Sequence, residues 1–480
     1  MLDVLVCGAG PVGLAMGVQL ARFGLSFRIV EKNKEPTPLN ESRALGVHAR
    51  TLEVFEDMGV LAAAEDAGMR WHGLNAFAGG KRILHVSFDE TDAAHPFLLS
   101  LSQSRTERIL EARLGELGAK VERGRELLSF EQDETRVRAK VGDETIEARW
   151  IVGTDGAHSV VRHGLGIEFE GAPYEERFVL TDLTIDGDYE PDESCAWFSP
   201  EGMLILLPLK GDKKARLLAQ VQGDPAPTLA LFEELLAKRA PGARLRLRDP
   251  VWLASFKIHH RLAARYRVGR GFIAGDAAHI HSPVGGQGMN TGIQDVYNLA
   301  WKLALAAKGG KDLLASYEVE RRPVAQAVVR GTDLATRAVL LRHPVAQEIR
   351  NAVYKYLGQL EVVQQRILRA ASELDIHYRK SPICGGSAPL FASGPSPGDR
   401  APDDIIDGGR RFFDVRSGTE HTLLAVDCPA PELRGVRVVK TKAAHRYGQG
   451  LYLVRPDGYV GYRTGDERAL GDYVSGVLGL

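Results

Sequence analysis

A glycine-rich run near the start of the chain has the spacing of a pyrophosphate-binding turn. It fits the pattern Gly-x-Gly-x-x-Gly, and its members are Gly8, Gly10, Pro11, Val12 and Gly13. The glycines permit a tight turn and close approach of a phosphate, and a helix that begins here favours negative charge. Glu31 ends the next apolar run, where its carboxylate can accept hydrogen bonds from a ribose, and Lys32 lies beside it. We expect a nucleotide cofactor here, and this pattern alone does not separate NAD from FAD.

Two later motifs place carboxylates beside strand-end glycines. The segment 153–162 reads Gly-Thr-Asp-Gly-Ala-His-Ser-Val-Val-Arg and contains Asp155 and Gly156. The segment 275–279 reads Gly-Asp-Ala-Ala-His and contains Asp276. A carboxylate in this position can accept hydrogen bonds from a sugar-like polyol, and the glycine lets a cofactor approach closely. The alternative is that Asp155 and Asp276 cap a turn or a helix.

A third glycine-rich stretch opens a predicted helix. It runs from Pro283 to Asn290 and includes Gly286, Gly288 and Met289, ahead of apolar residues at helical spacing. Free backbone N–H groups at a helix start can point at an anion. We therefore expect this stretch to face the cofactor as well.

These three motifs, in this order, resemble those of the single-component FAD-dependent aromatic hydroxylases, the family that includes p-hydroxybenzoate hydroxylase and the polyketide hydroxylases. The resemblance covers residues 1–55, 100–165 and 255–330. It implies that the cofactor is FAD and that Asp276 binds its ribityl chain. It also implies that Arg43 and Gln103 lie along the ribityl and pyrophosphate portion, and that Asp155 and Gly156 serve both FAD and NADPH. The turn from Pro283 would lie against the flavin ring, with the backbone of Met289 and Asn290 donating to its N1 and O2 edge.

The activity that the resemblance implies is hydroxylation of an aromatic small molecule, phenolic or polyketide-like, by O₂ through a flavin C4a-hydroperoxide. NADPH or NADH would reduce the FAD as a transient visitor, because the chain has no second Gly-x-Gly-x-x-Gly motif after a strand. Two other interpretations stay open: an oxidase or dehydrogenase on the same fold, and a non-catalytic flavoprotein that sequesters a reactive metabolite. No general base stands out, so we assign no catalytic residue.

Apolar patterns predict the elements that position these motifs. Val4–Cys7, Gly13–Phe23 and Phe27–Val30 indicate a strand, a helix and a strand, which form one βαβ unit. Strand-like clusters at 150–153 and 271–274 precede the two carboxylate motifs. We expect all of these strands to return to a single parallel sheet.

The other segments predict the rest of the architecture. Alternating stretches at 178–185 and 203–209 indicate antiparallel strands of an inserted second domain. Helices are expected at 287–307, 315–341 and 344–374, and a linker rich in Gly, Pro and Ser at 393–402. The predicted class is α/β, with these parts: a Rossmann-type FAD-binding domain at 1–175 and 265–330 (70–100 partly substrate domain), an inserted antiparallel-sheet substrate domain at 176–264, a helical segment at 331–392, and a thioredoxin-like C-terminal domain at 398–480.

The C-terminal assignment comes from a resemblance to the tail of the phenol and polyketide hydroxylase branch. The region from Gly398 lacks a Cys-x-x-Cys pair, so we expect it to be structural rather than redox-active. We also expect structural roles for His259 and His260. Arg321 and Arg322 are expected to form salt bridges on a helix surface.

Composition argues against several partners. Over 480 residues, 61 Lys and Arg nearly balance 62 Asp and Glu, so no strong field would hold nucleic acid or an anionic membrane. The sequence contains no export signal and no run of about 20 apolar residues, which predicts a cytoplasmic protein without a membrane partner. The cysteines form no close pair, so we expect no metal site. The oligomeric state stays open.

Overall fold

A largely parallel sheet forms the centre of one half of the molecule. The structure is a computed structural model that describes residues 1–480 except 40, 42–43, 283–284, 340–342, 359 and 387–392. The sheet has the order β17-β18-β11-β1-β2-β8, with β10 and β9 added beside β11. Its strands are β1 (Leu2–Cys7), β2 (Phe27–Glu31), β8 (Val121–Arg123), β9 (Leu127–Gln132), β10 (Val137–Val141), β11 (Glu144–Gly153), β17 (Arg267–Val268) and β18 (Gly271–Ile273). Because β1 pairs in parallel with β2 and β11, and β11 with β18, the predicted strand segments do return to one sheet.

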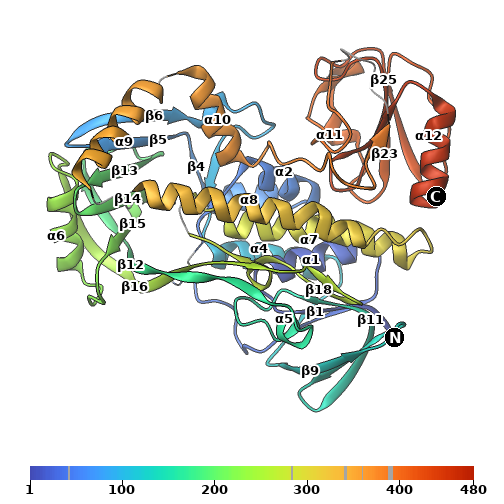
Figure 1. Ribbon diagram of the computed structural model, residues 1–480, viewed down its shortest axis with the longest axis horizontal. Coiled ribbons are helices and arrows are strands. Elements are labelled where there is room, and N and C mark those ends of the chain that lie inside the picture. Colours follow the sequence, from blue (N-terminus) through green and yellow to red (C-terminus); the bar gives the residue numbers. More distant parts are fainter. Residues whose placement is uncertain (40, 42–43, 283–284, 340–342, 359, 387–392) are drawn as a thin grey trace.

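Helices enclose this sheet and bury its apolar strands. Val4, Leu5 and Val6 of β1 are completely buried, as expected for a central parallel strand. The helices of this half are α1 (Pro11–Arg22), α2 (Ala49–Met58), α3 (Leu61–Ala67), α4 (Gln103–Glu116), α5 (Val160–Gly164), α7 (Gly288–Ala307) and α8 (Ala315–Val339). Figure 1 shows α7 and α8 running side by side across the middle of the molecule.

A second sheet forms the other half, in the order β19-β16-β12-β15-β14-β13-β5-β6. Its elements are β5 (Gly73–Ala78), β6 (Lys81–Ser87), β12 (Phe169–Gly187), β13 (Glu193–Ser199), β14 (Gly202–Pro208), β15 (Lys214–Val221), β16 (Leu245–Ala263) and β19 (His279–Ile280), with α6 (Leu229–Arg239) packed on it. The sheet is not wholly antiparallel as predicted, because β5 and β13 pair in parallel. β5 precedes the insertion in sequence, and the rings of Phe77 and Trp197 stack across this junction at 5.7 Å.

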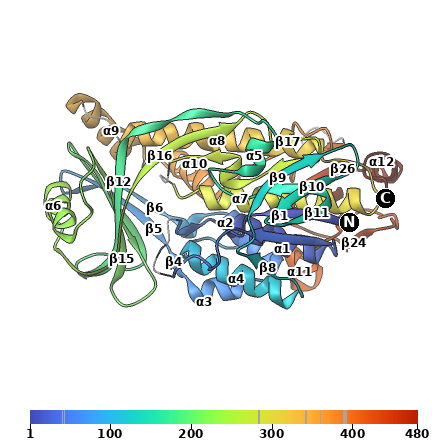
Figure 2. The ribbon, with the colours of Figure 1, turned by 90° about the horizontal axis from the view of Figure 1, so that it is seen from below.

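One long ladder connects the two halves. β12 and β16 pair antiparallel from Phe169 opposite Ala263 to Gly187 opposite Leu245. Two register shifts, near Pro173 and near Asp182, interrupt the ladder. Figures 1 and 2 show these strands passing from the parallel sheet out to the second sheet. The same two strands therefore contribute walls to both halves.

The predicted helix at 344–374 is two helices in the structure. They are α9 (Pro344–Leu357) and α10 (Glu361–Ser372), and α9 ends at Gly358, whose N–H caps the carbonyls of Val353 and Tyr354. Both helices lie near β5 and β6 in Figure 1. A small sheet, β3 (Gly46–Val47), β7 (Leu98–Ser100) and β4 (Met69–Trp71), with the 3₁₀ turn Phe88–Glu90, completes this region.

The C-terminal region has a sheet of its own, in the order β20-β26-β25-β23-β24. Its elements are β20 (Gly385–Gly386), β23 (His421–Val426), β24 (Val436–Thr441), β25 (Gly450–Val454), β26 (Val460–Thr464), the short pair β21 (Ile405–Ile406) and β22 (Arg410–Arg411), the 3₁₀ turn Asp407–Gly409, α11 (Phe412–Val415), α12 (Glu467–Tyr473) and a π-helical turn at Val474–Leu478.

The segment 393–402, predicted to be a linker, is instead packed against this region. The Gly398 N–H donates to the Val460 carbonyl at 2.7 Å, and the Ala401 N–H donates to the Gly458 carbonyl at 2.9 Å. Ala401 is buried. The Gly and Pro residues thus shape a fixed turn, because the backbone groups between them are hydrogen-bonded rather than solvated.

Two absences concern the described part of the chain. None of its helices has the length and apolarity needed to cross a membrane. Nor do its His, Cys, Asp and Glu side chains gather in any group of three or more that could hold a metal ion.

Candidate functional site

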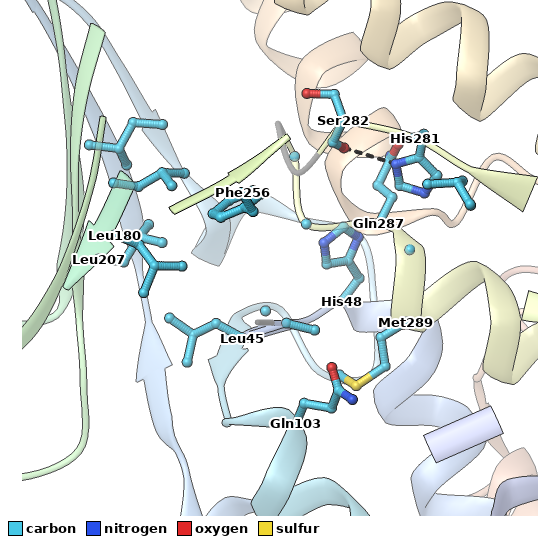
Figure 3. Close-up of a pocket in the computed structure, with 18 of the residues that line it drawn as sticks. Leu45, His48, Gln103, Leu180, Leu207, Phe256, His281, Ser282, Gln287 and Met289 are labelled. Atoms are coloured by element: carbon cyan, nitrogen blue, oxygen red, sulfur yellow. Dashed lines mark hydrogen bonds between the residues drawn. The ribbon is translucent and has the colours of Figure 1, made fainter. Parts of the chain in front are cut away.

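A single cavity of about 1500 Å³ lies between the parallel sheet and the second sheet. Ligand pockets usually measure roughly 300–1,000 Å³, so this one has room for more than one small molecule. The glycine-rich turn before α1 lines one part of it, and β12, β14 and β16 line another. Figure 3 shows apolar side chains such as Leu180 and Leu207 facing Met289 and Gln103 across the open space.

The glycines of the turn before α1 differ in whether they pack against the backbone or face the cavity. Gly8 has a φ of +99°, and an added Cβ would lie 2.5 Å from the Thr154 carbonyl oxygen. A Cβ on Gly13 would lie 1.9 Å from the Gly8 carbonyl oxygen, so both positions are closed to side chains by packing. Gly10 has open space where its Cβ would be and lines the cavity with Pro11 and Val12. A phosphate could therefore approach the start of α1 at Gly10.

Glu31 ends β2 and is bonded to this turn. Its Oε2 accepts from the Ala9 N–H at 2.9 Å, and its Oε1 accepts from the Asn33 N–H at 2.8 Å. Lys32 beside it is exposed, and neither residue lines the cavity in this structure. Glu31 therefore holds the end of β2 against the glycine turn.

The carboxylate of Asp155 caps a helix. Its Oδ1 accepts from the Ser159 hydroxyl at 2.5 Å and its Oδ2 from the Val160 N–H at 2.7 Å, at the start of α5. Burial raises the pKa of this carboxyl. The adjacent Gly156, with a φ of +77°, lines the cavity although Asp155 does not. The side chain of Asp155 is thus a helix cap, which is the structural alternative considered above.

Asp276 and Gln103 both lie on the cavity wall. Asp276 follows Gly275 in the 3₁₀ turn Gly275–Ala277, and its side chain is exposed to the cavity. Asp295 of α7 holds this turn, because its Oδ2 accepts from the Gly275 N–H at 3.2 Å and from the His279 ring at 2.8 Å. Gln103 begins α4 and lies near Met289 in Figure 3. Arg43 and Pro283, also predicted here, lie outside the described residues.

The start of α7 faces the same cavity. Gly286, Gly288 and Met289 line it. Asn290 does not, since its side chain is buried and joins β3 to the turn: its Oδ1 accepts from the His48 N–H, and its Nδ2 donates to the Gly286 carbonyl, both at 2.9 Å. The helix start is therefore held rigidly at the cavity wall.

Two histidines on this wall, the buried His48 and the half-buried His281, were not recognised in the sequence. His48 follows β3, and His281 lies between Asp276 and the start of α7. Burial lowers the pKa of each to about 4, so both are neutral at pH 7. Nothing in the local sequence distinguishes His48 from a core histidine, whereas the position of His281 inside a motif was an available signal.

Basic side chains line a further part of the cavity. They are His158, Arg162, Arg177, Lys257, His259 and Arg261. The guanidinium of Arg162 donates to the carbonyls of Ala277 and Ala157 at 3.0 and 2.9 Å and lies 4.0 Å from the Phe169 ring centre. This wall can attract an anionic ligand. The His259 ring is part of this wall, and its structural role stays a prediction.

Arg321 is not on a helix surface as predicted. It is completely buried, its Nε donates to Asp295 Oδ1 at 2.7 Å, and another nitrogen donates to the Tyr378 hydroxyl at 2.9 Å. The charge pattern of α8 suggested a solvated pair, but the packing of α7 on α8 encloses this one. Arg321 therefore fixes the Asp295 carboxylate that holds the Gly275 turn.

The arrangement fits a flavin dinucleotide. The cavity joins an open glycine at a helix start, a carboxylate at Asp276 and the start of a second helix at Gly288. These groups suit a pyrophosphate, a polyol and an electron-accepting ring that gains negative charge. The space left beyond them is bordered by apolar side chains.

Comparisons with known proteins find relatives along almost the whole chain. Residues 1–332 match the protein family described as FAD binding domain. A flavin-dependent monooxygenase of Mycobacteroides abscessus is 33% identical over 99% of this chain and 100% of its own length. Pentachlorophenol 4-monooxygenase of Sphingobium chlorophenolicum is 32% identical over 95% of this chain and 86% of its own. The solved structure of the anhydrotetracycline hydroxylase OxyS of Streptomyces rimosus is similar with a TM-score of 0.80 at 30% identity, covering 99% of this chain and 98% of its own.

Proposed function

Because this chain belongs to the FAD binding domain family and is a flavin-dependent aromatic hydroxylase, we propose that it uses NADPH or NADH to add one oxygen atom of O₂ to a phenolic or polyketide-like molecule. The continuity of the cavity carries this proposal, since one enclosure reaches from Gly10 to the apolar wall at Leu180 and Phe256. A cofactor and a substrate in it can meet away from bulk water, which protects a reactive oxygen donor from side reactions.

The residues of the chain would bind and orient the cofactor. Reduced FAD, when bound, would supply the oxygen chemistry. Gly10, Pro11 and Val12 would hold the pyrophosphate, and Asp276 the ribityl chain. The backbone at Met289 would face the flavin edge, where a helix start favours negative charge by roughly 0.3–2 kcal/mol.

Other predicted contacts remain proposals with adjusted roles. Glu31 and Lys32 would reach the ribose at the rim, with Glu31 also holding the turn. Gly156 would approach the cofactor by its backbone while Asp155 caps α5. Arg43, Gln103 and Pro283 keep the roles implied by the resemblance. The basic wall around Arg162, Lys257 and Arg261 would receive the phosphates of a visiting nicotinamide nucleotide.

The size and apolarity of the far wall favour a large, weakly polar substrate. Leu180, Leu207 and Phe256 border this end, with no carboxylate among them. Arg216, a cation that also lines the cavity, is buried and paired with Asp182 at 2.7 Å, so its charge is already balanced. A multi-ring phenol fits this wall better than a small substrate anchored by a free carboxylate.

The C-terminal region is proposed to be thioredoxin-like and structural. Support comes from its strand directions: β23 is parallel to β24 and antiparallel to β25, which is antiparallel to β26, before α12. Cys428 and Cys384, its cysteines, are far apart in sequence and both are free thiols. Without a close cysteine pair the region cannot cycle a local disulfide.

The test is a screen of phenolic and polycyclic compounds for faster NADPH or NADH consumption, followed by mass spectrometry of the products in ¹⁸O₂. We expect consumption to be slow alone, to rise with the right compound, and to yield a product heavier by one labelled oxygen. Label arriving from heavy-oxygen water would contradict the proposal. Hydrogen peroxide formed in proportion to product, without NADPH or NADH, would indicate an oxidase instead.

A further inference from the structure

Two buried polar atoms face each other behind the wall at the start of α7. His48 Nδ1 and Glu373 Oε1 are 3.6 Å apart, and both side chains are 2% exposed. Within the described part of the chain, neither atom has a hydrogen-bond partner. Buried polar atoms are paired in the great majority of cases, so two that face each other need an explanation.

The facing arrangement is held by three elements. The backbone N–H of His48, after β3, donates to Asn290 of α7 at 2.9 Å. Glu373 follows α10 in a left-handed conformation, with a φ of +58°, and its Oε2 accepts from Gln294 of α7 at 2.5 Å. The backbone of His48 and the side chain of Glu373 are thus both held by α7, which sets the two free atoms opposite each other.

The pair also connects to the cavity. The ring of His48 lines the cavity wall, as Figure 3 shows, and its Nε2 would lie 3.7 Å from a Cβ on Gly286. Glu373 lies one layer behind and does not line the cavity. One of the two residues can therefore touch a ligand, and the other can act only through it.

Burial sets the charge of both groups. It lowers the pKa of His48 to about 4 and raises the pKa of Glu373 to about 8. At pH 7 the carboxyl of Glu373 therefore carries a proton and the imidazole of His48 does not. The other titratable or charged groups that act on the pair are His281 on His48, and Arg321, Asp375 and Asp295 on Glu373.

We propose that His48 and Glu373 form a proton-transfer pair, in which His48 exchanges a proton with ligands in the cavity and Glu373 is the positioning residue that supplies it. The proton on Glu373 Oε1 moves to His48 Nδ1 while the proton on His48 Nε2 moves to an oxygen or nitrogen atom of the ligand. Glu373 is left as a carboxylate, His48 is again neutral, and no electrons are transferred. The reverse transfer accepts a proton from a ligand hydroxyl. This inference rests on the proposed function, because it assumes a ligand that gains and loses protons during turnover.

The first measurement reads the proton directly. Infrared spectra of the FAD-loaded protein should show a buried carboxylic acid band at pH 7 that disappears as the pH rises through about 8. The band should be missing in Glu373→Gln, which keeps the shape and the acceptor for Gln294. It should persist in Glu361→Gln, a matched control at the exposed start of α10. If Glu373→Gln keeps the band, the proton is not on Glu373 and the proposal is wrong.

The second measurement reads proton transfer without needing a substrate. The dithionite-reduced protein is mixed with air-saturated buffer across the pH range, and flavin reoxidation is followed by absorbance. We expect Glu373→Gln and His48→Gln each to slow reoxidation at pH 7 by about 10- to 100-fold and to flatten its pH profile. The double variant should be no slower than either single one, because the two residues act as a unit. An unchanged profile in Glu373→Gln, or additive losses, would overturn the pair.

The failure of this inference can be told apart from the failure of the proposed function. A protein with the infrared band and the altered pH profile that hydroxylates none of the compounds screened would refute the proposed function and leave the pair intact. A protein that forms labelled product with an unchanged pH profile in Glu373→Gln would do the opposite.

Discussion

The two ends of α7 bury polar groups in opposite ways. Near its middle and C-terminal end, Asn298 and Lys302 belong to a network in which every charge has a partner: Lys302 Nζ and Arg455 both bind Glu320, at 2.6 and 2.8 Å, and Arg455 also binds Asp457. At its start, the nearby imidazole of His48 and carboxyl of Glu373 are uncharged and each leaves an atom unpaired within the described structure.

This difference separates a network that stabilises the fold from a pair of groups that can change protonation. A fully paired buried network is costly to break and fixes how the C-terminal sheet sits on α7 and α8. A pair of neutral, incompletely bonded groups can change its protonation at little structural cost. The same helix thus anchors the C-terminal region at one end and, at the other, contacts both members of the adjustable pair, of which His48 lines the cavity.

The largest effect should come from breaking the paired network. Arg455→Ala leaves Glu320 with one cationic partner instead of two and should lower the free energy of unfolding by about 3–5 kcal/mol. Denaturant unfolding followed by fluorescence measures this loss. The exposed Arg468→Ala in α12 is the control and should change it by less than about 0.5 kcal/mol. Equal effects of the two variants would mean that the network does not anchor this region.

The next effect should separate the two carboxylates of the motifs. Asp276→Ala should weaken FAD binding by about 10- to 100-fold, as expected for the loss of charged hydrogen bonds, while the protein stays folded. Asp155→Ala should instead lower stability by about 0.5–2 kcal/mol, because Asp155 caps α5. Flavin content after gel filtration and thermal unfolding measure the two effects. Full FAD affinity in Asp276→Ala would refute its assignment.

A third prediction concerns the pH dependence of stability. The pKa of Glu373 is raised to about 8 by burial, so its stabilising contribution is present at low pH and is lost as the pH rises from about 4.5 to about 8. Relative to Glu373→Gln, the parent should therefore lose up to about 1.4 kcal/mol per pH unit across this window. Thermal unfolding at both ends of the window measures it. A constant difference between the two proteins would mean that Glu373 is charged throughout.

The smallest effect is expected at the start of α7. Gln287→Asp places a negative charge at the cavity wall and removes the hydrogen bond from Gln287 Nε2 to the Ala370 carbonyl. The charge should leave FAD content nearly normal, lower the flavin midpoint potential and slow reduction by NADPH. Gln287→Asn, which is shorter but neutral, controls for the lost hydrogen bond. If both variants behave alike, α7 does not begin at the flavin edge.

Local signals predicted the parallel core well. The βαβ unit, the two further strands and the start of α7 depend on residues close in sequence, and the structure has them within a few residues of the predicted bounds. The parallel pairing of β5 with β13 was not predicted, because neither strand carries a motif that links it to the other, whereas glycine and carboxylate motifs marked the strands of the parallel sheet.

The same distance in sequence explains what was missed in the site. His48 and Glu373 meet only through the packing of β3, α7 and α10, and no pattern near either residue signals the other. Arg321 looked like a surface residue because its helix carries other charges, and only the neighbouring helix buries it. Arg43 and Pro283 lie outside the described residues, so their roles stay predictions from the sequence.

The long ladder of β12 and β16 has a consequence for how this protein could acquire new substrates. Lys257 and Arg261 lie toward the parallel-sheet end of β16, whereas Gly187 and Leu245 pair at the far end and are connected through β13, β14, β15 and α6. Replacements in β13, β14 and β15 would reshape the part of the apolar wall that these strands form, while leaving the residues proposed to bind the cofactor in register. A directed-evolution library confined to 193–221 should therefore alter compound selectivity while the protein retains its flavin. The β12–β16 ladder would then separate the half of the protein that is kept from the strands that can be exchanged to change the substrate.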